Sequence, residues 1–234
     1  MQNSILVIEN YPGRGNAIAR LLRQFAVPFE VLASDGSELR VPSETAGLIL
    51  SGGPQSVTRI ASDEGAGLRA VLKVLDTAAQ KNLPVLGICL GHQLLGSWAG
   101  GLVSKLSNKV VGFKQIHVHE KTAIFDGPNE KNITAFQYHE DHLETLPQSC
   151  EVLAGSESCG IEAFKIKERL MWGVQFHPEL TLSDGRAILE GQPPPLLQWR
   201  PQTDLQAPYV IKAFTDLCLS KDGAPAGCTN HALA

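Results

Sequence analysis

Cys89 is the residue whose type and neighbours point most directly to chemistry. An apolar run meets a helical pattern at this cysteine, in the sequence LGICLG of residues 86–91, with glycine two positions before it and two after it. A nucleophile on a sharp strand-to-helix turn needs such glycines, because backbone segments approach closely there. The helix dipole would favour a thiolate, and the amide of Leu90 could point at an oxyanion. We therefore predict a nucleophile elbow, with a buried structural cysteine as the alternative.

A second pattern, GVQFHPE at residues 173–179, supplies the base that a thiol nucleophile needs. His177 lies at the end of a predicted strand, which Pro178 terminates. Glu179 could hold one imidazole nitrogen while the other faces the sulfur, which would fix the tautomer. A lone histidine at the end of a strand is more often structural. The predicted triad of Cys89, His177 and Glu179 therefore depends on the elbow.

The loop SGGPQS at residues 51–56 follows another apolar run and contains two adjacent glycines, Gly52 and Gly53. Parallel sheets bind ligands at the carboxyl ends of their strands, where this loop is expected. Its amides, chiefly that of Gly53, could complete an oxyanion hole with the amide of Leu90. The alternative is an ordinary Gly-Pro turn. A phosphate-binding loop is excluded, because no Gly-Lys-Ser or Gly-Lys-Thr follows.

These segments need a scaffold that brings them together, and the apolar pattern predicts one. Short apolar runs alternate with amphipathic helical segments along the first ninety or so residues. The runs are residues 5–8, 28–32, 47–50 and 84–88, and the helical segments are 17–25 and 68–79. Such alternation predicts a parallel sheet covered on both faces.

From about Lys109 the pattern changes to stretches in which apolar and polar residues alternate, which is typical of antiparallel ribbons. These stretches are residues 111–118, 133–138, 160–166 and 170–176. We therefore expect an α/β fold of three layers, with a mixed, mainly parallel central sheet and an added antiparallel ribbon.

The composition fits an ordinary soluble globular domain. Of the 234 residues, 43% are hydrophobic and 19% are charged, and the formal net charge is −4. The sequence has no basic patch for nucleic acid, no apolar segment as long as a membrane span and no secretory signal. Five scattered cysteines without Cys-x-x-Cys spacing argue against a disulfide framework. We therefore expect a cytoplasmic protein that binds neither nucleic acid nor membrane.

A metal site is not expected. His117 and His119 resemble a metal-binding pair, but no third ligand is apparent near them in the sequence. Alternation along a strand would place both side chains on one exposed face.

Three motifs together resemble those of the class I glutamine amidotransferases. They are GICLGHQLL at 87–95, VQFHPEL at 174–180 and LILSGGPQSV at 48–57. The resemblance covers roughly residues 4–190 and implies a flavodoxin-like fold. It also implies that Cys89, His177 and Glu179 release ammonia from the side chain of L-glutamine through a γ-glutamyl thioester, without a cofactor. The family's oxyanion loop falls on Gly52 and Gly53, together with Leu90.

The same resemblance implies roles for three further residues. Gln93, one helical turn after Cys89, matches a family position that contacts the substrate glutamine. Tyr138 and His139, in the stretch 138–141, fall where relatives hold the amino-acid end of that substrate, partly through main-chain groups. For His139, an ordinary surface position is the alternative.

The resemblance also implies a partner. Enzymes of this family pass ammonia to a synthase, and the chain has no synthase domain of its own, so we expect a separate synthase subunit. LSGGPQSV and GVQFHPEL look most like the glutaminase portion of GMP synthetase. IENYPG at 8–13 and the tyrosine of QYHED are similar to subunits of anthranilate and aminodeoxychorismate synthases. We favour a GMP-synthetase-like glutaminase whose acceptor is open.

Two other functions remain as alternatives. The same thiol and histidine could serve a γ-glutamyl hydrolase or peptidase that acts on a larger γ-glutamyl substrate. A regulatory or scaffold protein could also retain the fold without turnover, although the three residues of the triad argue against it.

The composition changes near residue 190. We expect a glutamine amidotransferase domain over residues 1–190 and a Pro-rich appendage over 191–234, with a helix from Pro208 to about Leu219 and a frayed tail. The segment 192–206 is a candidate for docking the partner, with a packed surface loop as the alternative.

Overall fold

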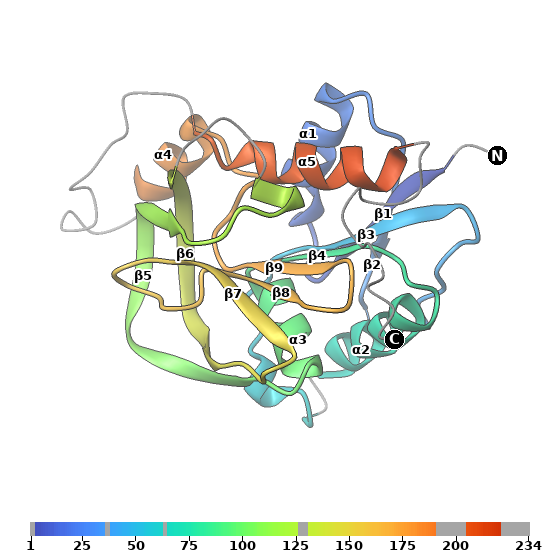
Figure 1. Cartoon of the computed structure of the whole chain (residues 1–234), viewed down its shortest axis with the longest axis horizontal. Helices are drawn as coiled ribbons and strands as arrows, with labels where there is room; N and C mark the ends of the chain where they lie inside the picture. Colours follow the sequence, from blue (N-terminus) through green and yellow to red (C-terminus); the bar gives the residue numbers. More distant parts are fainter. Residues whose placement is uncertain (1–2, 36–37, 63–64, 126–130, 191–204, 221–234) are drawn as a thin grey trace, which may run out of the picture.

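The computed structural model describes residues 3–35, 38–62, 65–125, 131–190 and 205–220. Within these residues the strands form one nine-stranded sheet in the order β2-β1-β3-β4-β9-β8-β7-β5-β6 (Figure 1). The strands are β1 (Ser4–Glu9), β2 (Phe29–Ala33), β3 (Thr45–Leu50), β4 (Val85–Ile88), β5 (Leu102–Val118), β6 (Asn132–Thr145), β7 (Cys150–Gly155), β8 (Ala163–Ile166) and β9 (Met171–Val174). The α-helices are α1 (Gly15–Gln24), α2 (Ala66–Gln80), α3 (Leu90–Trp98), α4 (Leu182–Glu190) and α5 (Pro208–Leu219).

The five strands β2, β1, β3, β4 and β9 are parallel and form the centre of the fold. Alternate residues of β1 point to opposite faces, as the period of a strand requires. Ile5 and Val7 join the core under α1 and α5, whereas Leu6 and Ile8 join the core under α2 and α3. Figure 1 shows the sheet between these two helical layers. The predicted α/β arrangement of three layers is confirmed.

The remaining strands are antiparallel. β8 pairs with β9, β7 pairs with β8, and the long ribbon of β5 and β6 joins the sheet through β7. The assignment of residues 170–176 to an antiparallel ribbon was partly wrong, because β9 pairs in parallel with β4 on its other side. β9 is buried along its whole length, as expected for a central strand.

The pairing of β5 with β6 contains an irregularity. Lys105 pairs with Asp141 and Val110 pairs with His139, so residues 106–109 bulge out opposite Glu140. A bulge re-aims the side chains next to it. Lys105, which precedes this stretch, and Lys109, its last residue, both line a pocket beside Cys89.

Helix α5 has the bounds that the sequence predicts, and it packs into the main core. Val210, Ile211 and Phe214 are buried, and the Phe214 ring meets Trp172 of β9 edge to face, with centroids 6.4 Å apart. The division of the chain at residue 190 stays a prediction. The Pro-rich segment up to 204 and the tail from 221 lie outside the described residues. No helix in the described part of the chain is both long and apolar enough to cross a membrane.

Replacing Phe214 by alanine should lower the free energy of unfolding by about 3–5 kcal/mol, because a fully buried aromatic ring would leave a cavity. Tyr209→Ala on the same helix is the matched control, since Tyr209 is 57% exposed. It should cost no more than about 0.5 kcal/mol. Urea denaturation of both variants measures the difference. Equal, small effects would show that α5 lies outside the cooperative core.

Candidate active site

Cys89 lies on a strained turn between β4 and α3. Its backbone has φ 51° and ψ −103°, in the region that residues other than glycine rarely adopt. A Cβ atom on Gly87 would lie 2.4 Å from the carbonyl oxygen of Gly91, and one on Gly91 would lie 2.4 Å from that of Leu50. Both glycines are therefore required by close backbone approach, as the elbow pattern predicts.

His177 and Glu179 come just after β9 and form a buried pair. Nδ1–H of His177 donates to Oε1 of Glu179 over 2.7 Å, and the backbone N–H of His177 donates to the carbonyl of Phe136 over 2.9 Å. The two side chains are almost completely buried. The imidazole also interacts with the Cys89 thiol, so the structure brings the three predicted triad residues together.

The charge state of His177 follows from these neighbours. Burial by itself lowers the pKa of His177, because it penalises the charged imidazolium. The charges of Glu179 and Cys89, and hydrogen bonds to both, outweigh that effect and raise the pKa well above its usual value. These neighbours therefore favour the charged imidazolium, with the Glu179 carboxylate on one side of the ring and the Cys89 sulfur on the other.

The Gly52-Gly53 loop lies against His177 and Cys89. A Cβ atom on Gly52 would lie 3.1 Å from Cε1 of His177 and 3.5 Å from Cβ of Cys89. One on Gly53 would lie 2.8 Å from the side chain of Leu90. The two residues predicted to donate to an oxyanion, Gly53 and Leu90, are therefore neighbours. Within the described residues, neither of their amides donates to a protein acceptor.

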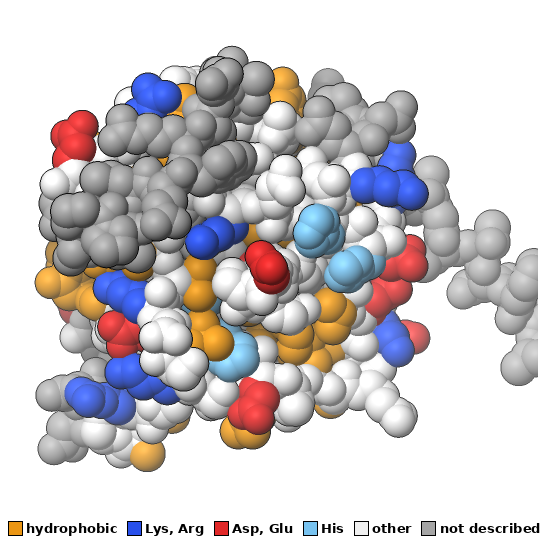
Figure 2. Space-filling model, turned by 90° about the vertical axis from the view of Figure 1, so that its left-hand side faces the viewer, with side chains coloured by type: hydrophobic (Ala, Val, Ile, Leu, Met, Phe, Trp, Pro, Cys, Tyr) orange, Lys and Arg blue, Asp and Glu red, His pale blue; other side chains and the backbone are white. Residues whose placement is uncertain are grey.

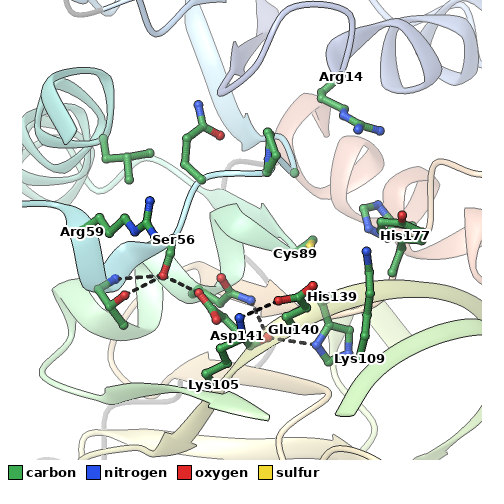
Figure 3. A pocket seen from close by; sticks show the side chains of 18 of the residues that line it. Arg14, Ser56, Arg59, Cys89, Lys105, Lys109, His139, Glu140, Asp141 and His177 are labelled. Carbon is green, nitrogen blue, oxygen red and sulfur yellow. Dashed lines mark hydrogen bonds and ion pairs between the residues drawn. The ribbon is translucent and has the colours of Figure 1, made fainter. Parts of the chain in front are cut away.

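A pocket of about 880 Å³ opens beside these residues. Among the predicted site residues, those that line it are Cys89, His177, Glu179, Gly52, Gly53, Gln93, Tyr138 and His139. Leu90 is buried behind the wall. Figure 3 shows Cys89 and His177 on one side of the pocket and the labelled side chains of the β5–β6 ribbon on the facing side.

Amide side chains connect the sulfur to the ribbon. Nε2 of Gln175 is 3.7 Å from Sγ of Cys89, and Oε1 of Gln175 accepts a 3.2 Å hydrogen bond from Nε2 of Gln93. Gln93 also donates to the backbone carbonyl of Asp141 over 2.8 Å, and Nδ1–H of His139 donates to the same carbonyl over 2.9 Å. Burial lowers the pKa of His139 to about 4, so this imidazole is neutral.

Sequence reasoning overlooked Gln175 in this network and named Asp141 only as part of the stretch 138–141. Gln175 lies two positions before His177, and side chains two positions apart in an extended chain share a face. That spacing was a usable signal. Asp141 contributes its backbone carbonyl, and its carboxylate accepts from the hydroxyl of Ser56. Such tertiary hydrogen bonds leave no pattern in one sequence.

Cations lie around the pocket mouth. Lys105 forms an ion pair with Glu140 at 2.8 Å, and Nζ of Lys109 lies 3.8 Å from the centroid of the Tyr138 ring. Arg14 and Arg59 also line the pocket, Arg14 at the top of the view in Figure 3 and Arg59 at its left, beside Ser56. On the side of the molecule where the ribbon lies, Figure 2 shows positive and negative side chains interspersed among the described residues.

The described residues contain no group of three or more potential metal ligands. Of the suspected pair His117 and His119, the first hydrogen-bonds Oδ1 of Asn132 at 2.6 Å. The expectation that the chain holds no metal stays a prediction.

A buried carboxyl lies behind the pocket wall. Glu162 accepts hydrogen bonds from Nε2 of Gln137 over 2.6 Å and from the hydroxyl of Ser156, and its backbone carbonyl accepts from the amide of Gln175 over 2.8 Å. Burial raises the pKa of Glu162 to about 7, against the effect of both side-chain hydrogen bonds. Glu162 is thus a neutral acid below that pH.

Comparison with known proteins places these features in a family. The model of the family described as glutamine amidotransferase class-I matches residues 6–191. The chain is 38% identical over 190 residues to a glutamine-hydrolyzing GMP synthase subunit of Methanococcus vannielii, covering 80% of this chain and 93% of that one.

Two crystal structures share the fold. A protein of Thermoplasma acidophilum, described as a proposed subunit of GMP synthase, is 25% identical, with a TM-score of 0.73 over 95% of this chain and 97% of that one. A glutamine amidotransferase of Thermotoga maritima is 20% identical, with a TM-score of 0.76 over 94% of this chain and 99% of that one. The predicted flavodoxin-like fold is confirmed by this likeness.

The Glu162→Gln variant should change how stability depends on pH. Between pH 4.5 and about 7 the native Glu162 holds a proton that the unfolded chain has lost. The free energy of unfolding of the wild type therefore falls as pH rises through this window, by up to about 1.4 kcal/mol per pH unit from this group. Glutamine cannot ionise, so the variant should gain stability over the wild type as pH rises.

Urea denaturation at pH 4.5, 5.5, 6.5 and 7.5 measures that difference, in which the contributions of the buried histidines cancel. Glu151→Gln, at an exposed position on β7, is the matched control and should differ from the wild type by a constant amount. A constant difference for Glu162→Gln as well would contradict the raised pKa.

Proposed function

We propose that this chain, which belongs to the class I glutamine amidotransferase family, hydrolyses L-glutamine to glutamate and ammonia through Cys89, His177 and Glu179. Membership of that family makes the protein a glutamine amidotransferase. The observation that carries the proposed triad is the buried His177, which is hydrogen-bonded to Glu179 and in contact with a cysteine on a strained turn.

The chemistry follows from the order of these groups. The charged imidazolium of His177 stabilises the Cys89 thiolate, which attacks the carbonyl carbon of the glutamine side chain and forms a C–S bond. The carbonyl oxygen becomes an oxyanion, and the amides of Gly53 and Leu90 stabilise it. His177 then donates its proton to the nitrogen as the C–N bond breaks. Ammonia leaves and a γ-glutamyl thioester remains.

The second half restores the enzyme. The neutral imidazole of His177 takes a proton from water, whose oxygen attacks the thioester carbonyl. The C–S bond breaks, glutamate leaves, and the sulfur again faces a charged imidazolium. Throughout, Glu179 holds Nδ1–H, which keeps Nε2 directed at the reacting atoms and stabilises the positive ring.

Three residues are proposed to hold the rest of the substrate. Gln93 and His139 both donate a hydrogen bond to the backbone carbonyl of Asp141, and both line the pocket. Tyr138 precedes His139 on β6, and the ammonium of Lys109 lies over its ring. A neutral His139 suits this role, because it adds no charge beside the charged His177.

We further propose that the ammonia passes to a separate synthase subunit. The relative from Methanococcus vannielii, whose length this chain matches over 93%, is named as one subunit of a GMP synthase. That name favours a partner that forms GMP. A cytoplasmic location would suit this partnership and stays a prediction.

Cys89→Ala should abolish glutamine-dependent ammonia release, lowering it by more than about a thousandfold, because the thioester can no longer form. Cys150→Ala is the matched control, since Cys150 lies on β7 away from the pocket. A coupled assay for glutamate and ammonia, with and without a candidate synthase, measures both. A glutamine-analogue electrophile should label Cys89 in the wild type, as peptide mass spectrometry would show.

Faster turnover of γ-glutamyl peptides than of glutamine would favour the γ-glutamyl hydrolase. A wild type that is silent with the synthase present, and that forms no Cys89 adduct, would favour a scaffold.

The synthase partner should receive nitrogen directly from glutamine. With amide-¹⁵N glutamine and excess unlabelled ammonium, the mixture of this chain and a candidate GMP-forming synthase should give a product that carries mostly ¹⁵N. Mass spectrometry of the product measures the isotope ratio, with Cys89→Ala as the control that should give only ¹⁴N. A product whose ¹⁵N fraction equals that of the ammonium in solution would exclude transfer between the two subunits. A single purified chain that makes the aminated product alone would exclude the need for a partner.

A further inference from the structure

We infer that Asn10 is a positioning residue, which fixes the loop of residues 51–55 and thereby holds the Gly53 amide in place for the oxyanion. Asn10 is 2% exposed and does not line the pocket. It therefore acts through the loop and not on the substrate. The inference rests on the proposed function, because it concerns the rate of the same reaction.

Asn10 reaches both ends of the loop. Its backbone N–H donates to Oγ of Ser51 over 3.0 Å, and its side-chain Nδ2 donates to the carbonyl of Ser51 over 2.5 Å. Its own carbonyl accepts from Nε2 of Gln55 over 2.7 Å. Gly52, Gly53 and Pro54 lie between these two attachment points, so one residue ties the loop on either side of the predicted oxyanion donor.

The parallel sheet brings Asn10 to this place. Asn10 follows β1 directly and Ser51 follows β3 directly, and the two strands pair in register with Ile8 opposite Leu50. The amide of Ser51 continues that ladder by donating to the carbonyl of Ile8 over 3.0 Å. Asn10 is the first residue after β1, and its side chain reaches the loop that follows β3.

The loop needs such ties because its own backbone supplies few. Consecutive glycines have more conformational freedom than any other residues, and the amide of Gly53 donates to no acceptor among the described residues. A Cβ atom on Gly53 would lie 2.5 Å from Oε1 of Gln55, so the Gln55 side chain runs along Gly53 on its way to Asn10. Ser51 Oγ also donates to the carbonyl of Gly52 over 2.9 Å.

Small displacements of an oxyanion donor reduce catalysis steeply. Loss of such a donor costs about a hundredfold to a thousandfold in kcat, and misplacement by about 1 Å from a remote change costs up to about a hundredfold. Asn10→Ala removes the side-chain hydrogen bond to the Ser51 carbonyl and the acceptor for Ser34, and it leaves both backbone ties. We therefore expect kcat for glutamine hydrolysis to fall about tenfold. KM should stay within about twofold, because the donor acts in the transition state.

Alkylation of Cys89 by iodoacetamide separates this role from a general structural one. Displacement at a saturated carbon needs the thiolate but forms no oxyanion, so its rate should stay within about twofold of wild type in Asn10→Ala. Asn10→Asp keeps the shape and the acceptor for Ser34 but replaces the Nδ2 donor by an oxygen. It should show the same pattern even if the alanine variant folds poorly. Asn132→Ala, which removes an exposed amide bonded to His117, is the matched control and should match the wild type.

The outcomes are distinct. A kcat unchanged in both Asn10 variants, or one that falls in step with the alkylation rate, would overturn the positioning role. Wild-type chain that alkylates at Cys89 but releases no ammonia from glutamine, with the synthase present, would overturn the proposed function and the inference with it. A lower kcat with unchanged alkylation and KM would support the inference.

Discussion

The close approach of backbone segments around Cys89 is the constraint on which the rest of the site depends. The positive φ of Cys89 is a backbone conformation that costs a residue other than glycine about 1–3 kcal/mol. The turn therefore persists only where the surrounding structure fixes it. Here neighbouring backbone segments fix it. The amide of Cys89 donates to the carbonyl of Val174 over 2.9 Å, which ties the elbow to the end of β9. Gly87 and Gly91 leave room for the carbonyls that would otherwise collide with a Cβ atom. The strained backbone of Cys89 is thus held between the ends of β4 and β9.

The sheet explains why residues far apart in sequence act together. Parallel strands end at one edge, and four of them deliver a functional segment there. β1 leads to Asn10, β3 to the Gly52-Gly53 loop, β4 to Cys89, and β9 to Gln175 and His177. The antiparallel ribbon adds the facing wall, through Tyr138, His139 and Asp141 of β6. The parallel strands therefore supply the groups proposed to react, whereas the ribbon supplies those proposed to bind.

Much of this could be predicted from local pattern. The buried runs, the elbow glycines, the His-x-Glu spacing and helix α5 each express a local requirement, and the structure places each where it was expected. β7 escaped notice, because CEVLAG has no clear alternation and its register comes from β5 and β8. The parallel partner of β9 was missed because pairing is decided by distant strands. Asn10, Gln175 and the carbonyl of Asp141 matter through hydrogen bonds that form only after folding.

Three buried histidines show how the environment of a side chain sets its pKa. His92 lies on α3 against the Phe164 ring, and burial lowers its pKa to about 3. Burial likewise lowers the pKa of His139 to about 4, although it lines the same pocket as His177. His177 is as deeply placed, yet its pKa rises, because Glu179 and Cys89 provide the compensating charge that the others lack. Of these three imidazoles, the one that faces the sulfur therefore favours its charged form, and the other two favour the neutral form. The imidazole proposed to protonate the departing ammonia thus lies next to the only cysteine among the described residues that line this pocket.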